Sequence, residues 1–298
     1  MFEIGLFMNI RDDRDFLEFH SLSADTLTSL LHRAEQLATH WRNRTMPQTL
    51  RGKRVGIIVD DTGWRNTTAF DLGVQAMGGI AIQPPIHFNV GEVTADLAGY
   101  LDNWFDLLVV RTKELTTLKE LASSARAPVI NARTKSNHPC ETLGDLAYIK
   151  AVRGTLDGLK VVGIAPDANI FRSWVEAAES MPINVVQVYP ERWHVSDPAL
   201  INANFDASRD FGHVFDADVI ITDSCPTNGD DSDLVDYQVS GSMLDQCKGN
   251  VIFLPCPPVA RNQEVTADAM EHSACQTRQA KAFLLHAQNA LMEWAMDA

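Results

Sequence analysis

The sequence predicts an α/β protein with two domains, each built on a parallel sheet flanked by helices. From about residue 54 onward, short β-rich apolar runs alternate with longer helical patterns, which is typical of βαβ units and parallel sheets. The alternation comes in two series, separated by one turn-rich segment. The chain has 298 residues, a length that favours two domains of roughly 150 residues.

The first series contains four candidate strands and the helices that connect them. The strands are expected at Val55–Val59, Ile80–Gln83, Leu107–Val110 and Pro128–Ile130. The helical patterns cover about 66–77, 92–103 and 114–123, and a further helix is expected over about 139–152.

The second series repeats this order further along the chain. Its strands are expected at Lys160–Ala165, Asn184–Val188, Val219–Thr222 and Val251–Leu254, with helices over about 169–180, 197–204 and 234–248. The turn-rich segment Arg153–Lys160 lies between the two series. The domains are therefore expected to cover residues 1–152 and 153–298.

Two further helices are expected outside this alternation. One covers about 24–41, behind Ser21 and Ser23 as possible caps, and the other about 277–296. Both carry apolar residues at the i, i+3, i+4, i+7 spacing of an amphipathic helix, namely Leu27, Leu30, Leu31, Ala34 and Leu37, and then Ala280, Phe283, Leu284, Ala287 and Leu291.

Composition and charge restrict the class of partner. The formal net charge is -14 and no basic patch stands out, so a nucleic-acid partner is not expected. No run approaches the ~20 apolar residues of a membrane span, and the start lacks the basic region of a signal peptide. The five cysteines are odd in number and widely spaced, which fits a reduced, cytoplasmic setting without a metal site.

Several short motifs follow one another in the order found in a known family. His138–Leu146, with the sequence HPCETLGDL, opens a helix directly after a strand, and Val109–Thr112 (VVRT) ends an earlier strand. The segment Gly91–Asp96 and the downstream motifs Ala217–Asp223 and Phe253–Asn262 continue the series. The chain resembles the aspartate and ornithine carbamoyltransferases along nearly its whole length.

The resemblance implies a carbamoyl phosphate domain, an amino-acid domain, and terminal helices that cross between them. The last helix, about 277–296, would then pack back on the first domain. The resemblance also implies a homotrimer, in which Gly91–Asp96 reaches across to a neighbouring subunit. An enzyme of this kind requires no metal and no organic cofactor.

The segment Gly63–Thr67 is the candidate donor site. It lies between a strand and a helix, where backbone N–H groups and Arg65, Asn66 and Thr67 would hold a phosphate or a similar anion. Trp64 would fill this pocket or stack on an altered donor. The alternative interpretation is a plain turn, capped by Thr or Asn.

Arg111 and His138 are expected at the carboxyl ends of parallel strands, where open α/β sheets bind ligands. The resemblance implies that they polarise the carbonyl of the carbamoyl group. The alternatives are a surface ion pair for Arg111 and a helix-capping histidine for His138.

Some positions depart from the family pattern at the donor site. The loop Ser-Thr-Arg-Thr-Arg of the family is Gly-Trp-Arg-Asn-Thr here, and the glutamine of the His motif is Glu141. Glu141 would pair with Arg65 or contact an amide nitrogen, or would be an exposed helix carboxylate. A substrate arginine of the last helix is replaced by Leu284. The pattern predicts fewer cations and one additional carboxylate at this site.

The acceptor positions match the family better. Asn169, Asp223, Thr227 and Asn228 resemble the positions by which an α-amino acid and its side-chain amine are held. Asp223 beside the Cys256 thiol would hold an ammonium group and help it lose its proton, because only the neutral amine is nucleophilic. The alternatives are a turn-capping aspartate and a core cysteine.

These features together predict an enzyme that moves a carbamoyl or related group from an anionic donor to the amine of a small amino-acid-like acceptor. An altered donor is a second enzymatic interpretation, which the changes at Trp64 and Glu141 would suit. The alternative from another class is a non-catalytic member of the family, which binds a metabolite or partners an active enzyme.

Overall fold

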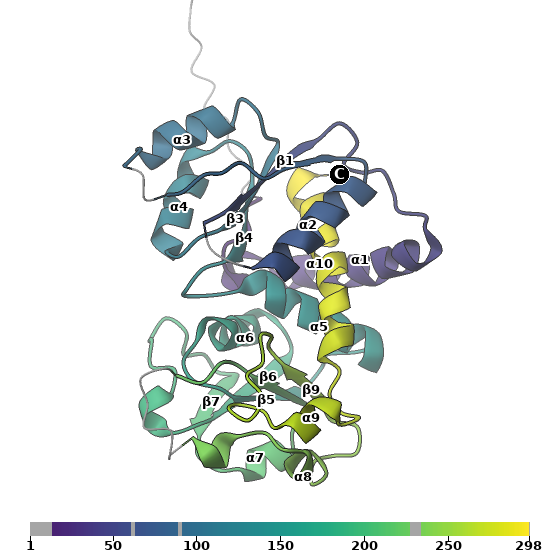
Figure 1. Cartoon of the computed structure of the whole chain (residues 1–298), viewed down its shortest axis with the longest axis vertical. Helices are drawn as coiled ribbons and strands as arrows, with labels where there is room; N and C mark the ends of the chain where they lie inside the picture. Colours follow the sequence, from purple (N-terminus) through teal and green to yellow (C-terminus); the bar gives the residue numbers. More distant parts are fainter. Residues whose placement is uncertain (1–13, 61–62, 89–90, 227–233, 298) are drawn as a thin grey trace, which may run out of the picture.

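The computed structural model describes residues 14–60, 63–88, 91–226 and 234–297. Two α/β units lie one above the other, with a helical layer between and beside them (Figure 1). The predicted fold class, two parallel sheets flanked by helices, is confirmed.

The first sheet has four parallel strands in the order β2-β1-β3-β4. Its strands and helices are β1 (Arg54–Val59), α2 (Trp64–Ala76), β2 (Ile80–Ile82), α3 (Thr94–Leu101), β3 (Leu107–Arg111), α4 (Leu115–Ser124) and β4 (Val129–Arg133). The central strands β1 and β3 are apolar and buried, as expected of a sheet covered on both faces. The order places the carboxyl ends of β1, β3 and β4 side by side.

The second sheet has five parallel strands in the order β7-β6-β5-β8-β9. Its elements are β5 (Leu159–Ile164), α6 (Asn169–Ser180), β6 (Ile183–Val188), β7 (Phe205–Ser208), α7 (Gly212–Phe215), β8 (Val219–Thr222), α8 (Gly241–Leu244), β9 (Ile252–Pro255) and α9 (Ala267–Glu271). In this sheet β5 is central, with β6 on one side of it and β8 on the other.

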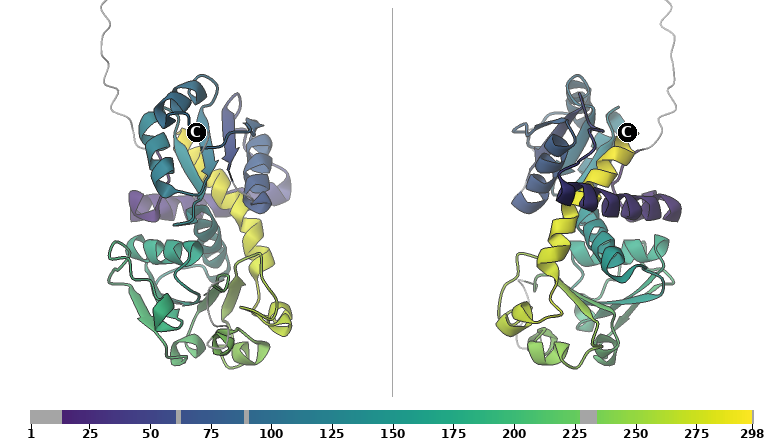
Figure 2. Two further views of the ribbon diagram at one scale, coloured as in Figure 1. Left: turned by 60° about the vertical axis from the view of Figure 1, so that its left-hand side comes forward. Right: turned by 90° about the vertical axis from the view of Figure 1, so that its right-hand side faces the viewer.

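Three long helices join the two units. They are α1 (Ala24–Asn43), α5 (Pro139–Arg153) and α10 (Thr277–Met296). Figure 2 shows α10 rising from the second unit into the first, while α1 lies across the middle of the molecule. Helix α10 packs against α1, α2 and α5. The terminal helices therefore cross between the units, and α10 packs back on the first one.

Two predictions in the second series are wrong. Residues 197–204 form turns instead of a helix, because local side-chain bonds hold the backbone: Asp197 accepts from the Ala199 amide, and Asn202 donates to the Leu200 carbonyl and accepts from the Asn204 amide. The expected helix over 234–248 is reduced to a 3-10 turn, Val235–Tyr237, and the short α8. Ser240 caps α8 by accepting from the Met243 amide, so a new helix starts there instead of continuing.

Strand β7 was not predicted at all. Its sequence, Phe-Asp-Ala-Ser, lacks the β-branched residues that mark a strand. It forms the edge of the sheet, where only β6 pairs with it. Among the described helices, none is long and apolar enough to cross a membrane.

Candidate active site

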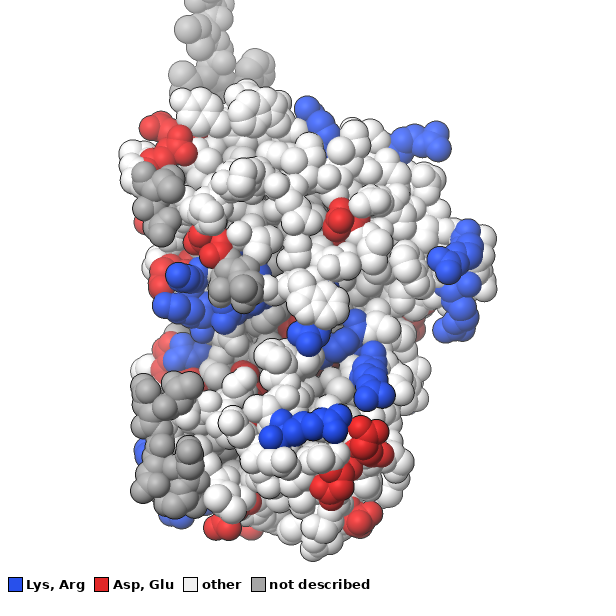
Figure 3. Space-filling model, in the orientation of Figure 1, with Lys and Arg blue, Asp and Glu red and all other residues white. Residues whose placement is uncertain are grey.

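A pocket of about 440 Å³ lies where the two units face each other. Its walls come from both halves of the chain, and its lining consists of Gly63, Trp64, Arg65, Asn66, Arg111, Arg133, His138, Glu141, Asn169, Ile170, Asp223, Ser224, Cys256, Pro257 and Pro258. Lys and Arg side chains gather along the waist between the units (Figure 3). In a chain of net charge -14, this concentration of cations favours an anionic ligand at the waist.

Two arginines stand side by side at the floor of this pocket. Arg111 ends β3, Arg133 ends β4, and the strand register pairs these two residues. Strand ends of a parallel sheet share one edge, so both side chains come to the same opening. Arg133 was missed from the sequence, although it ends the strand that precedes the His138 motif. The pocket therefore holds three arginines, Arg65, Arg111 and Arg133.

The turn before α2 is shaped by its contact with Arg111. Gly63 occupies the N-cap position of α2, and a Cβ at Gly63 would collide with the Arg111 guanidinium. A side chain at position 63 would therefore displace the Arg111 guanidinium from its place in the pocket.

The other residues of this turn have different surroundings. Trp64 is 69% exposed, and the Arg65 guanidinium lies 5.0 Å from the centroid of its ring. Asn66 donates to the Ala132 carbonyl and accepts from Gln288, so its amide ties α2 to β4 and α10. Thr67 does not line the pocket, because its hydroxyl donates to the Gly63 carbonyl. Arg65 and Trp64 are thus the side chains of this turn that remain for a ligand.

His138 is held at the start of α5 by contacts from both units. Its backbone N–H donates to the Ser173 hydroxyl of α6 at 2.9 Å. The preceding Asn137 accepts from Asn131 at 2.7 Å and from Thr134 at 2.8 Å. The histidine is therefore fixed by its backbone, and its ring is left to face the pocket.

The His138 ring is uncharged at neutral pH. Burial lowers its pKa to about 3, against the influence of Glu141, which raises it. Its Nδ1 atom is buried and has no hydrogen-bond partner among the described residues. A neutral ring of this kind can donate one hydrogen bond to a ligand oxygen without adding charge.

Glu141 is buried instead of exposed, and its partner differs from the one expected. The Glu141 carboxylate lies 2.7 Å from the Lys281 ammonium of α10, so the predicted pair with Arg65 is wrong. Lys281 was not singled out from the sequence. Leu284, one turn further on, is buried and lies against Gly144 of α5, which fits its lack of a ligand role.

The acceptor side of the pocket is formed by the second unit. Asp223 follows β8, and its Oδ2 atom has no hydrogen bond within the described part of the chain. Burial raises the pKa of Asp223 to about 6, partly offset by backbone N–H groups of Ser224 and Ile170. Asp223 is therefore ionised at neutral pH and can pair with an ammonium group. Thr227 and Asn228 lie outside the described residues.

Asn169 and Cys256 complete this side. Asn169, the first residue of α6, donates to the Thr134 carbonyl at 2.7 Å, which leaves its amide oxygen as an acceptor. Burial raises the pKa of the Cys256 thiol well above its usual value, so the thiol stays neutral. A neutral thiol is a weak hydrogen-bonding group here and not a nucleophile.

The buried carboxylate of Glu176 connects the second unit to Asn137, the residue before His138. Glu176 of α6 accepts from the Phe19 amide at 3.2 Å and from the Asn137 side chain at 3.4 Å. Burial raises its pKa from 4.5 to about 7. The folded state therefore binds this proton more tightly than the unfolded state does.

Replacing Glu176 by Gln is expected to change how stability depends on pH. The stabilising proton is fully present below pH 4.5 and is lost as pH rises through about 7, a difference of about 3 kcal/mol. Wild type should therefore lose about this much stability relative to Glu176→Gln between pH 4.5 and 8, measured by urea unfolding. Glu179 is exposed one turn further along α6, and Glu179→Gln is the control. It should show no change in stability relative to wild type over this pH range. A parallel pH dependence in Glu176→Gln and wild type would contradict the assignment.

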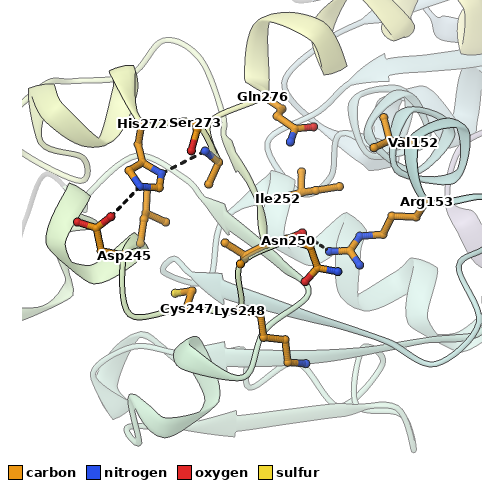
Figure 4. Close-up of a pocket in the computed structure, with 14 residues that line it drawn as sticks. Val152, Arg153, Asp245, Cys247, Lys248, Asn250, Ile252, His272, Ser273 and Gln276 are labelled. Carbon is orange, nitrogen blue, oxygen red and sulfur yellow. Dashed lines mark hydrogen bonds and ion pairs between the residues drawn. The ribbon is translucent and has the colours of Figure 1, made fainter.

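A larger hollow, of about 750 Å³, lies on the second unit (Figure 4). Its charged groups already have protein partners. Arg153 donates to the Asn250 and Asp218 carbonyls, Lys248 pairs with Asp218, and His272 lies between the Asp245 carboxylate and a backbone N–H. The smaller pocket at the waist, with three arginines and an unpaired Asp223 oxygen, is the better candidate for chemistry.

Comparison with known proteins assigns both halves of the chain to one family. Residues 14–151 match the family described as aspartate/ornithine carbamoyltransferase, carbamoyl-P binding domain. Residues 157–295 match aspartate/ornithine carbamoyltransferase, Asp/Orn binding domain.

Relatives and solved structures that match nearly the whole chain come from the same family. The ornithine carbamoyltransferase of Oceanobacillus iheyensis is 32% identical, covering 94% of this chain and 93% of the relative. That of Bacillus subtilis is 30% identical, with the same coverage of both chains. The structure of ornithine carbamoyltransferase from Pyrococcus furiosus superposes with a TM-score of 0.91 at 25% identity, covering 96% of this chain and 98% of that one. The chain belongs to the aspartate/ornithine carbamoyltransferase family of enzymes.

Proposed function

We propose that the pocket at the waist transfers a carbamoyl group from carbamoyl phosphate to the amine of a small amino-acid-like acceptor. One observation carries the proposal. Arg111 and Arg133 stand side by side on one wall, and the Asp223 carboxylate stands on the wall contributed by the other unit. A site with cations on one side and a carboxylate on the other suits an anionic donor and a cationic acceptor.

The donor would bind against the first unit. Its phosphate would accept hydrogen bonds from Arg65, Arg111 and Arg133, close to the N-terminus of α2. Its carbonyl oxygen would face Arg111 and His138. Both can donate a hydrogen bond to that oxygen as it gains negative charge, which lowers the barrier to attack.

The acceptor would bind against the second unit. Asp223 would hold the ammonium group and Asn169 would bind the amino-acid part, for which Thr227 and Asn228 are further candidates from the sequence. The ammonium group first gives up a proton, and the neutral nitrogen then attacks the carbonyl carbon. The new N–C bond forms as the C–O bond to phosphate breaks. Phosphate leaves with the bonding electron pair. The attacking nitrogen still carries two protons: one passes to solvent or to the departing phosphate, and the other stays on the nitrogen of the product.

The non-catalytic alternative rested on the residues lost from the phosphate loop. Arg133 supplies a cation that the loop lacks, and His138, Arg111 and Asp223 share one pocket. These observations favour an enzyme over a binding protein. The altered turn at Trp64 is compatible with the same donor, because the ring is exposed and leaves the arginines accessible to the pocket.

Binding of the donor is the experiment that tests this assignment. Thermal melting should rise with carbamoyl phosphate and, by a smaller amount, with inorganic phosphate, because a ligand that binds only the folded state stabilises it. Ornithine and aspartate, added after carbamoyl phosphate, should raise it further if either is the acceptor. No shift with either phosphate compound at millimolar concentration would contradict the proposal.

We also propose a cytoplasmic homotrimer, in which Gly91–Asp96 of one subunit lies near the cleft of the next. Val93 in this segment is 62% exposed, and β2 is an edge strand with Ile80 and Ile82 exposed. Exposed apolar groups beside a sheet edge favour association. The five cysteines are free thiols, as expected in a reducing compartment.

Light scattering is expected to give a mass near three times the 33.0 kDa of the chain. Val93→Asp should weaken the assembly by placing a charge in the contact. Asp is favourable at this helix N-cap, so α3 itself should remain intact. Val152→Asp, at an exposed valine of α5, is the matched control and should leave the mass unchanged. A wild-type protein that is monomeric at micromolar concentration would contradict the trimer.

A further inference from the structure

Helices α5 and α10 share a buried ionic cluster beside the pocket. The Lys281 Nζ atom lies 2.7 Å from Glu141 Oε1, and 2.8 and 3.0 Å from the two oxygens of Asp145. The side chains of Lys281, Glu141 and Asp145 are 13%, 9% and 5% exposed. The three contacts match the three N–H bonds of an ammonium group, so Lys281 has its hydrogen-bonding capacity filled.

The cluster keeps Glu141 ionised. Burial alone would raise the pKa of Glu141, but the Lys281 ammonium and further cations more than offset burial, so that the pKa is lowered. Burial raises the pKa of Asp145 to about 6; the Lys281 ammonium lowers this pKa and the neighbouring Glu141 carboxylate raises it. A buried ion cluster is costly compared with apolar packing, which suggests that the charge serves the adjacent pocket.

The second oxygen of Glu141 lies on the side of His138. Glu141 Oε2 lies 3.9 Å from His138 Nε2, which is longer than a hydrogen bond. Both residues line the pocket together with Arg111. A carboxylate acceptor therefore lies next to the two side chains that would bind the donor carbonyl.

We propose that Lys281 is a positioning residue, which holds the Glu141 carboxylate so that Oε2 accepts the N–H of the transferred group and excludes groups without one. This inference rests on the proposed carbamoyl transfer and adds a rule of donor selection to it. A carbamoyl group presents an N–H beside its carbonyl, whereas the acetyl group of acetyl phosphate presents a methyl. The methyl would leave a buried carboxylate oxygen without a partner, which is the kind of mismatch that binding sites reject strongly.

Lys281 and Glu141 form a matched pair in this account. With Lys281 present, a glutamine at 141 would turn its oxygen to the ammonium and its NH2 group to the pocket. The pocket would then present the N–H of the glutamine to the N–H of the carbamoyl group, and neither of the two can accept a hydrogen bond. Once the cluster carries no charge, the glutamine can turn its oxygen to the pocket instead.

The test compares carbamoyl phosphate, acetyl phosphate and inorganic phosphate as ligands of the full-length protein, by thermal melting and equilibrium binding. Wild type should prefer carbamoyl phosphate over acetyl phosphate by at least about tenfold. Glu141→Gln should reduce this preference to near one while its affinity for inorganic phosphate stays unchanged. The uncharged triple variant Glu141→Gln/Asp145→Asn/Lys281→Met should regain part of the preference, which a purely structural role of Lys281 would not produce. Glu114→Gln, at an exposed carboxylate paired with Lys135, is the control and should behave as wild type.

The outcomes separate this inference from the proposed function. Equal binding of carbamoyl and acetyl phosphate by wild type would overturn the inference and leave carbamoyl transfer standing, and this result does not depend on any variant folding. A preference that persists in Glu141→Gln would overturn it as well. Failure of wild type to bind any of the three compounds would overturn both the inference and the proposed function.

Discussion

Arg111→Ala is expected to lower kcat/KM for carbamoyl transfer by at least about 10³-fold. Arg111 stands beside Arg133 at the strand ends and reaches the pocket beneath Gly63, so it would contact both the phosphate and the carbonyl of the donor. One preorganised donor to a developing oxyanion contributes about 10²–10³ in rate, and the phosphate contact adds to this. Steady-state kinetics with carbamoyl phosphate as the varied substrate measure the effect.

The same variant should lose the thermal shift that the donor produces, while its stability without ligand changes little, because a side chain at the rim of a pocket contributes mainly to binding. Arg126→Ala is a matched control on the first unit, since Arg126 is exposed and pairs with Asp102 away from the pocket. If Arg111→Ala bound carbamoyl phosphate as wild type does, the assignment of this wall to the donor would be refuted.

Asp223→Asn is expected to lower kcat/KM for the acceptor by about 10²–10³-fold. It should also remove the decrease of kcat/KM at acidic pH. Removing one charge of a buried pair costs about 2–5 kcal/mol of binding, which covers this range. The pKa of Asp223 is raised to about 6, so the carboxylate that pairs with the ammonium is lost as pH falls through about 6. The wild-type rate with subsaturating acceptor should therefore decrease below pH 6, and the Asn variant should lack this decrease.

The effect should be confined to the acceptor. The KM for carbamoyl phosphate is expected to change little in Asp223→Asn, because Asp223 lies on the opposite wall from the arginines. Asp245→Asn provides a control in the same unit, where Asp245 pairs with His272 in the larger hollow. An unchanged pH profile in Asp223→Asn would show that another group binds the amine.

The sequence alone was sufficient for the architecture and for part of the site. Apolar runs of β-forming residues predict eight of the nine strands in the described part of the chain, and the missing one, β7, is a polar edge strand that carries no such signal. Arg111 could be found because strand-end residues of a parallel sheet share one edge, and His138 because its motif opens the helix that follows such a strand. Arg133 was missed because β4 extends to this residue, three residues beyond the end of the strand predicted from its apolar run.

Lys281 could not be predicted in this way. It lies 140 residues from Glu141 in the sequence, on a helix whose amphipathic pattern gave it no special place. Its position depends on how α10 packs against α5, and that packing is a tertiary property. Glu141 was recognised as unusual, but its partner could be named only after the two helices were seen together.

The formation of a ureido product from carbamoyl phosphate and a primary amine tests the central claim most directly. Purified protein would be incubated with carbamoyl phosphate and, in separate reactions, ornithine, aspartate and other small amino acids. Both released phosphate and the carbamoylated product would be quantified, with Arg111→Ala as the inactive reference. The account predicts that at least one amino acid accelerates phosphate release and yields its carbamoylated derivative in equal amount. Phosphate release that no amine accelerates, with no ureido product from any of them, would contradict it.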